Sequence, residues 1–327
     1  MTVLLAASAA GQERPKLFGE VEFFGYTGVD VSKLRASLPF HEQDRFVEET
    51  FVAQLDQTGE AVRQATGHWP TDLANVCCDE RGNRIIFIGL AGEPARYNPP
   101  PRGHARLPEN ILGLYDQAFK LKMERVEQGT ADEDDSKGYY MSSYPPLRSI
   151  LLKFRAYALR HEALVREVVE TSADERQRIA AAELLGYARQ SQSQLAALVR
   201  ASQDSNSGVR NNATRALVVL ANSNPKVAGE IPVDSFIEML LSDKWSDLNK
   251  ASALLNLITK SRNEETLARL RRREVLDRLI EMARWRSGHA EPARYILGRI
   301  AGIDESRLRQ LVANKQVEVI IAAQRVG

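Results

Sequence analysis

The amino-acid sequence predicts an α+β N-terminal domain followed by an all-α array of helical repeats, so the chain is mainly helical overall. Strand-like alternation of apolar and polar residues appears within residues 15–93. From residue 146 onward the apolar positions follow helical spacing without a convincing strand, and similar units recur there. A length of 327 residues is more than one small domain usually needs, which agrees with this division.

Composition places the chain among ordinary globular proteins. Hydrophobic residues make up 43% and charged residues 27%, which excludes a wholly disordered or fibrous chain. The formal net charge of +1 is too small for a protein dedicated to polyelectrolytes. No apolar run approaches the roughly 20 residues that span a bilayer, so we predict no transmembrane segment. Two cysteines, Cys77 and Cys78, are too few for a disulfide-dense scaffold or a four-cysteine zinc site.

Residues 1–12 have features of a truncated signal peptide. The stretch from Thr2 to Ala10 carries no charge and ends in small residues, as at a signal-peptidase site. No Lys or Arg precedes Arg14, and one explanation is a start codon assigned too far downstream. We therefore expect a periplasmic or secreted protein. The alternative is a cytoplasmic protein with a frayed, alanine-rich N-terminus.

The first domain, residues 15–93, is expected to place two helices over one face of a small sheet. Val21 and Phe23 alternate with Glu20 and Glu22, as in a strand that has one apolar side. The expected elements are a strand at Phe18–Phe24, a helix capped by Asp30 and ended by Pro39, a helix at about Phe46–Thr66, and a hairpin of strands Leu73–Cys78 and Ile85–Leu90.

The two cysteines fall at the end of the first hairpin strand. Side chains of consecutive strand residues point to opposite faces, so one cysteine is expected inside and one outside. A disulfide between sequence neighbours closes a strained eight-membered ring. We therefore interpret Cys77 and Cys78 as small hydrophobic residues without a disulfide, and leave a redox role open.

This domain resembles the POTRA domain, the periplasmic polypeptide-binding module found in front of outer-membrane assembly barrels. The resemblance rests on the element order, on VEFFG at 21–25, on VSKLRASL at 31–38 and on the aromatic Phe46. The family usually carries Gly near the position of Gln43, where this sequence departs from it. The resemblance implies a partner strand added at an open sheet edge. Any small α+β domain with the same order is the alternative.

Residues 94–108 form a proline-rich linker at the expected domain boundary. Three consecutive prolines at 99–101 favour extended polyproline II, a semi-rigid spacer. Residues 109–145 follow, with a helix at about 109–128 and an acidic, tyrosine-rich loop. Its tyrosines are candidate contact residues, although packing at the domain junction explains them equally well. They are Tyr139, Tyr140 and Tyr144.

Helical units recur through residues 146–327. The clearest unit lies at 204–221 and reads DSNSGVRNNATRALVVLA, and degenerate copies begin near Asp174, Asp247 and Glu291. Small alanines in these units let paired helices approach closely, while leucines fill the gaps. The units resemble HEAT and armadillo-type repeats. This resemblance implies an α-solenoid whose extended, curved surface binds a protein partner.

Charge is unevenly distributed along the chain. Residues 155–327 hold 27 Lys and Arg against 21 Asp and Glu, so this part is net basic. Arginines concentrate between Arg269 and Arg294, and basic residues near aromatic ones suit a phosphate backbone. HEAT-like DNA glycosylases of the alkylpurine-excising kind use such a surface, so a nucleic-acid-binding protein or glycosylase is the alternative function. The arginines can instead complement helix dipoles and pair with nearby acids. The expected acids are Glu264, Glu265, Glu274 and Glu281.

Catalytic motifs do not appear in the sequence. It has no nucleophile elbow, no phosphate-binding glycine loop and no histidine pair at helical spacing, so we predict no cofactor and no metal. We expect a non-enzymatic protein–protein interaction scaffold of the bacterial cell envelope that binds a polypeptide, with nucleic acid as the less favoured partner. Besides the three tyrosines, the candidate binding residues are Arg271, Arg272, Arg273, Arg284, Arg286, Trp245 and Trp285.

Overall fold

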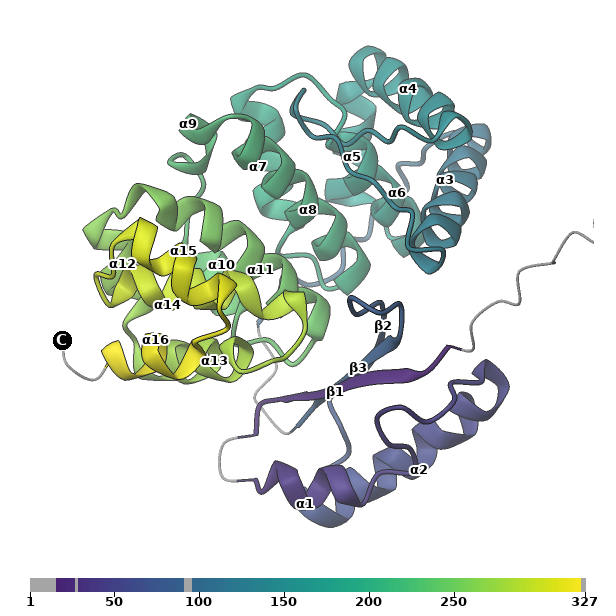
Figure 1. Ribbon diagram of the computed structural model, residues 1–327. Coiled ribbons are helices and arrows are strands. Elements are labelled where there is room, and N and C mark those ends of the chain that lie inside the picture. The colour runs from purple at the N-terminus through teal and green to yellow at the C-terminus, as the bar shows by residue number, and fades with distance from the viewer. Residues whose placement is uncertain (1–15, 27–28, 91–95, 325–327) are drawn as a thin grey trace, which may run out of the picture.

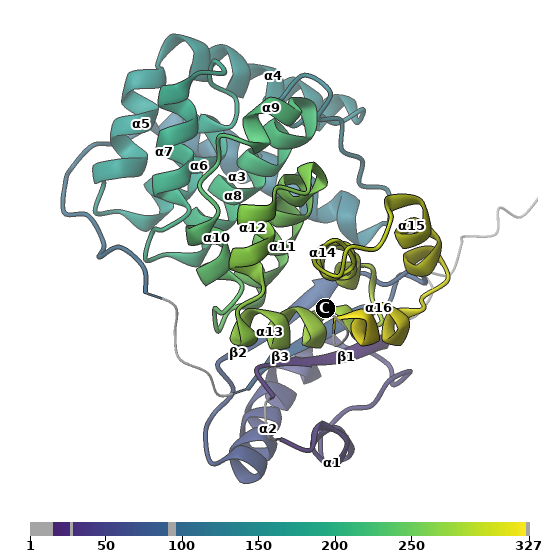
Figure 2. The same ribbon diagram turned by 90° about the vertical axis from the view of Figure 1, so that its left-hand side faces the viewer.

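The computed structural model describes residues 16–26, 29–90 and 96–324. Within these ranges a three-stranded sheet and two helices come first, and only helices follow them (Figure 1). The prediction of a mainly helical chain with a small N-terminal sheet is confirmed. Figure 2 shows the sheet lying between helices α1 and α2 on one side and the later helices on the other. The predicted signal peptide at residues 1–12 lies outside the described residues.

The N-terminal elements follow the predicted order of strand, helix, helix, strand and strand. Strand β3 is central, parallel to β1 and antiparallel to β2. The Asp30 carboxylate accepts hydrogen bonds from the Ser32 and Lys33 amides and so begins α1 as predicted. Gly82, with φ of 83°, supplies the left-handed residue of the hairpin turn. The elements are β1 (Phe18–Phe24), α1 (Val31–Ala36), α2 (Glu48–Thr66), β2 (Asp72–Cys77) and β3 (Arg84–Gly89).

One face of the sheet packs on α1 and α2. Val21 and Phe23 of β1 are buried there together with Leu34 of α1 and Val62 of α2. A cluster of phenylalanine rings closes the end of this core, and Phe18 stacks on Phe40 with ring centroids 4.4 Å apart. This face therefore forms the hydrophobic core that the alternation in β1 predicts.

The opposite face of the sheet is covered as well. The Phe87 ring lies 5.0 Å from the Trp245 ring and 4.9 Å from the Trp285 ring, so the sheet and the later helices share a second core. Glu22 lies on this face and is only 5% exposed. Its carboxylate tolerates this burial because it accepts hydrogen bonds from Arg286. The uniformly apolar run of β3 is typical of a strand that is buried on both faces.

The interpretation of the two cysteines is wrong. Cys77 and Cys78 form a disulfide, and both side chains are half-buried. Cys77 is the last residue of β2 and Cys78 lies beyond it, so the alternation of strand side chains does not extend to this pair.

The later helices are arranged in pairs. The second helices of four pairs, α6, α8, α11 and α14, pack against one another in chain order, and α5, α7, α10 and α13 each pack on their own partner. No helix of the described residues is long and apolar enough to cross a membrane. The helices are α3 (Glu109–Glu127), α4 (Pro145–Arg160), α5 (Glu162–Thr171), α6 (Glu175–Leu185), α7 (Gln192–Ala201), α8 (Ser207–Ser223), α9 (Pro225–Ala228), α10 (Asp234–Met239), α11 (Trp245–Ile258), α12 (Glu264–Leu270), α13 (Arg273–Ala283), α14 (Glu291–Ile300), α15 (Glu305–Ala313) and α16 (Val317–Ala323).

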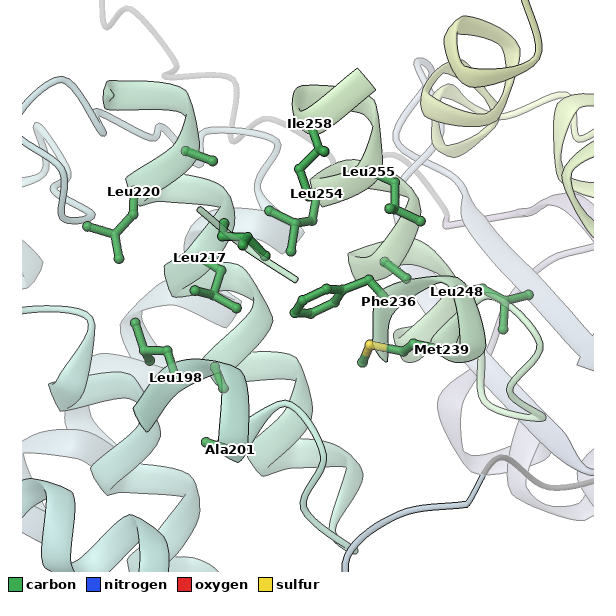
Figure 3. Packing of buried hydrophobic residues seen from close by; sticks show 14 of the residues in the cluster. Leu198, Ala201, Leu217, Leu220, Phe236, Met239, Leu248, Leu254, Leu255 and Ile258 are labelled. Carbon is green, nitrogen blue, oxygen red and sulfur yellow. The ribbon is translucent and has the colours of Figure 1, made fainter. Parts of the chain in front are cut away.

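The predicted apolar stripes lie between these helices. Figure 3 shows Leu217 of α8 facing Leu254 of α11, with Phe236 of α10 beside them and Leu220 on the other side of α8. All four side chains are buried, and small residues such as Ala213 let the helices approach closely. The stripes therefore have the packing role that the sequence predicts.

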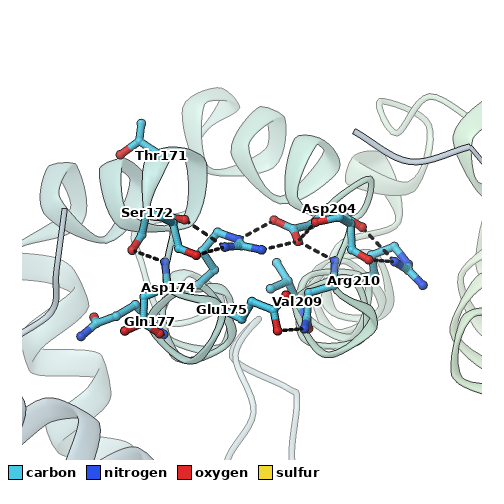
Figure 4. A network of polar contacts seen from close by, with 12 residues as sticks. Thr171, Ser172, Asp174, Glu175, Gln177, Asp204, Val209 and Arg210 are labelled. Carbon is cyan, nitrogen blue, oxygen red and sulfur yellow. Dashed lines mark hydrogen bonds and ion pairs between the residues drawn. The ribbon is translucent and has the colours of Figure 1, made fainter. Parts of the chain in front are cut away.

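Two buried arginines tie the pairs together at their turns (Figure 4). Arg178 of α6 donates to both carboxylate oxygens of Asp204, at 2.8 and 3.0 Å, and Arg210 of α8 donates to both of Asp247, at 3.0 and 2.7 Å. Each also donates to two backbone carbonyls of the turn before its own helix. We call Arg178 and Arg210 the turn arginines. Each guanidinium satisfies carbonyl groups of the turn before its own helix and also binds a carboxylate of the next helical pair.

Candidate functional site: the inner face of the helical pairs

The predicted arginine-rich region is a surface of ion pairs. Arg269, Arg271, Arg272 and Arg278 pair with Glu265, Glu264, Glu274 and Glu281, so the predicted pairing is confirmed. Arg284 pairs with Glu318 at 2.9 Å, and Arg286 pairs with Glu22 at 3.2 Å and also with Glu42. Arg273 is the exception, since its side chain is 95% exposed and its nearest acid, Asp277, is 3.9 Å away. A surface whose cations are already paired offers little uncompensated charge to a phosphate backbone.

The two candidate tryptophans lie at the junction with the sheet rather than beside these arginines on the surface. Trp285 is 2% exposed and donates its Nε1–H to the carbonyl oxygen of Phe23 at 3.0 Å. Trp245 stacks on Phe87, and its backbone amide donates to Asp72 at 2.8 Å. Both residues hold the sheet on the helices: Trp285 joins an apolar contact to an indole hydrogen bond, and Trp245 joins one to a backbone hydrogen bond.

The three candidate tyrosines are half-buried, and each ring faces a cation. Tyr139 lies under Arg155 at 4.6 Å from guanidinium carbon to ring centroid, and Tyr144 lies under Arg125 at 4.7 Å. Tyr140 faces both Lys122 at 4.8 Å and Arg215 at 4.6 Å. These contacts fix the loop on the helices.

Tyr140 belongs to a charged cluster on what we call the inner face, the surface of α6, α8 and α11 on which α3 and residues 129–144 lie. Lys122 of α3 pairs with Glu183 of α6, and Arg215 of α8 pairs with Glu133 of the loop. Asn222 donates to Asp135 at 2.7 Å and extends this contact along α8. The structure thus brings together charges from four separate segments.

Burial sets the electrostatics of the cluster. Burial alone would raise the pKa of Glu183, but the charges of Lys122 and Arg215 hold that pKa below its usual value, so the carboxylate stays ionised. Lys250 of α11 lies next to the cluster and makes no ion pair within the described residues. Burial and the neighbouring Arg215 lower the pKa of Lys250 to about 8. The inner face therefore carries one amine without a counter-charge in contact.

The geometry of this face suits surface recognition rather than enclosure of a small molecule. The cavity lined by Tyr140, Tyr187 and Arg215 measures about 20 Å³, which is room for one water. In the residues that the structure covers, no group of three or more His, Cys, Asp and Glu side chains could hold a metal ion. What the face offers is a row of charged and aromatic side chains along packed helices.

Tyr140 was predicted from the sequence as a candidate binding residue, whereas Lys122, Glu183, Arg215 and Lys250 were not. One signal was available in α11, where Lys250 is the one basic residue of the helix and stands next to the buried stripe residue Ala251. The others are ordinary charged residues of amphipathic helices, and only the fold brings them together.

Comparison of the chain with protein-family models and with curated protein sequences finds no match.

Proposed function

We propose that this chain is a non-enzymatic interaction protein that binds a polypeptide partner on a HEAT-like solenoid. Support for the solenoid comes from the consecutive packing of α6, α8, α11 and α14 and from the turn arginines, which repeat one contact between successive pairs. Solenoids of this kind present extended surfaces to their partners.

The observation that carries the proposal is that the helical pairs already bind two segments of their own chain that form neither helix nor strand, one extended and one folded back as a loop. Residues 96–107 cross the turns, where Asn98 donates its amide to the Gln203 carbonyl at 2.8 Å and Gly103 exchanges backbone hydrogen bonds with Thr171 and Ala173. The Tyr97 ring stacks on Arg210 at 3.6 Å. Backbone pairing together with a side-chain anchor is how extended peptides are recognised.

The second segment, residues 129–144, lies on the inner face. Glu133 pairs with Arg215, and the Lys137 carbonyl accepts a hydrogen bond from Gln190 at 3.4 Å. This segment has no helix or strand, yet it is held by charged and aromatic contacts along α6 and α8. We propose that a partner polypeptide with similar charged and aromatic side chains binds the part of the inner face around Lys250.

The N-terminal sheet offers a second docking place if the POTRA resemblance holds. The outer edge of β1 is closed, since Phe18 accepts from the Gln43 amide at 2.7 Å, Val21 from Arg35 and Phe23 from Trp285. Strand β2 forms the other edge and, within the described part of the chain, pairs with β3 alone. A partner strand would therefore add to β2. Placement in the cell envelope rests on the sequence of residues 1–12.

Site-specific photo-crosslinking in cells tests the proposal. A benzophenone amino acid at position 250 samples the inner face, and the same residue at position 200, on the outward side of α7, is the matched control. We expect a discrete polypeptide adduct from position 250 and none from position 200. Folded protein that gives no adduct at 250, or equal adducts at both positions, would overturn the proposal.

A further inference from the structure

A pocket of about 670 Å³ opens where the sheet meets the helices, and we call it the junction pocket. The start of β1 and the β2–β3 hairpin form one wall, with Glu20, Cys78 and Asp79. The turn between α13 and α14 forms the other wall, with Ser287 and His289. Of the binding residues predicted from the sequence, Arg286 lines this pocket and the others do not.

The charged groups of the lining do not balance. Four carboxylates face three cations, and burial together with the charge of Lys250 lowers the pKa of His289 to about 4, so that ring is neutral at pH 7. The lining is therefore one positive charge short of neutrality. The carboxylates belong to Glu20, Glu42, Asp79 and Glu80, and the cations belong to Arg81, Arg286 and Lys315.

Most of these groups already have partners. Arg286 pairs with Glu42, Asp79 accepts from the Arg81 and Asn83 amides at 2.8 Å each, and Lys315 lies 3.8 Å from Glu80 at the rim. Two buried oxygens in the lining have no hydrogen-bond partner among the described residues, and buried polar atoms of this kind are rare. They are Glu20 Oε2 and Ser287 Oγ, and Ser287 as a whole is only 4% exposed.

We propose that the junction pocket binds one organic cation, an ammonium or guanidinium group, through the Glu20 carboxylate and the Ser287 hydroxyl. Such a group donates several hydrogen bonds, which both oxygens can accept, and its single charge neutralises the lining. The cation is either a free small molecule or a basic side chain of a polypeptide. The second source rests on the proposed function, whereas the first does not.

Titration of the full chain with N-acetyl-arginine amide, followed by amide chemical shifts of Ser287 and Gly288, tests the pocket. The neutral isostere N-acetyl-citrulline amide is the ligand control. We expect saturable shifts with the arginine compound and at least about tenfold weaker binding of the citrulline compound, because a charge-assisted hydrogen bond is lost. Glu20→Gln should weaken the arginine compound by about tenfold as well. Glu60→Gln on α2, whose side chain is 40% exposed and does not line the pocket, should leave its affinity unchanged.

Equal affinity for the two compounds, wild-type affinity in Glu20→Gln, or no shifts in the wild type would each overturn the proposal. Ser287→Ala, with thermal unfolding as a check on its fold, gives a second independent variant. Tighter binding of a short arginine-containing peptide than of agmatine assigns the pocket to a polypeptide, and the reverse order assigns it to a small molecule. Cation binding without any crosslink at position 250 would support this pocket while removing the proposed polypeptide surface on the inner face.

Discussion

The turn arginines and the surface arginines of residues 269–286 use the same chemistry in opposite surroundings. Arg178 and Arg210 have side chains no more than 3% exposed, and each holds one carboxylate by two hydrogen bonds. Arg271 and Arg272 are more than 40% exposed and pair with acids that are still more exposed. Breaking a buried pair costs about 3–5 kcal/mol, whereas an exposed pair contributes about 0–1 kcal/mol. Burial, not the number of ion pairs, therefore decides which arginines hold the fold.

The largest expected effect comes from Arg210→Leu. Removing this guanidinium leaves Asp247 buried with only the Ser242 and Tyr97 hydroxyls as partners, and it also leaves two turn carbonyls without donors. We expect the free energy of unfolding to fall by about 3–5 kcal/mol. Chemical denaturation measures this change as a lower midpoint at an unchanged slope.

Arg271→Leu is the matched control for that change, and its free energy of unfolding should fall by less than about 0.5 kcal/mol. Similar losses in the two variants would abolish the distinction between the turn arginines and the surface arginines.

His289 shows what burial does to a base that has no acid beside it. Burial and the charge of Lys250 lower its pKa to about 4, whereas the unfolded chain protonates it near 6.5. The unfolded state therefore binds the proton first, and stability is lost as the pH falls from 6.5 towards 4. The loss is at most about 3 kcal/mol. Denaturation midpoints between pH 7 and 4 should fall less steeply in His289→Gln than in the wild type. Parallel curves would show that His289 titrates normally in the fold.

Arg286→Ala should give an intermediate loss, because this side chain is half exposed but its partner Glu22 is buried. Glu22 would keep the Arg286 backbone amide at 2.9 Å and lose the guanidinium. We expect the free energy of unfolding to fall by about 1–2 kcal/mol. Arg273→Ala on the same surface is the control and should cost nothing measurable, since Arg273 is almost fully exposed. If both variants unfold at the wild-type midpoint, the Glu22–Arg286 contact does not hold the junction.

Local signals in the sequence predicted most elements of the fold. Asp30 marks the start of α1, the alternation in β1 marks its strand, and the alanine and leucine stripes mark α8 and α11. Each of these signals lies within one helix or one strand, so no knowledge of distant residues is needed.

The junction and the inner face could not be predicted in this way. Trp285 is followed by Arg286 in the sequence, but its indole contacts a strand more than 250 residues earlier. The neighbouring residues in the sequence do not indicate that the indole points towards this strand. Lys122, Glu183 and Arg215 come from three helices, and their contact depends on how α3 lies across α6 and α8. The apolar run of β3 was a usable sign of a second covered face.

Apart from the control variants, the smallest expected effect on stability comes from replacing Arg271, Arg272 and Arg273 together by Glu. The four ion pairs they lose are exposed, so the free energy of unfolding should fall by about 1 kcal/mol in total, mostly through the new like charges beside Glu264 and Glu274. The same variant tests the alternative of a nucleic-acid-binding protein. Each phosphate contact adds about 0.9 to the dependence of log affinity on log salt, so removal of three contacts would lower that slope by about 2.7.

Because Arg271 and Arg272 are already paired and Arg273 alone supplies little charge, we expect the wild type to show no DNA binding at physiological salt and the variant to behave identically in a fluorescence anisotropy titration. Wild-type binding that weakens steeply with salt and disappears in the variant would contradict this expectation. The acids of this surface would then have to release their arginines to phosphate at little cost, which fits pairs worth less than about 1 kcal/mol each. The surface arginines contribute little to stability because their ion pairs are weak, and for the same reason they could exchange those acids for a partner's phosphates.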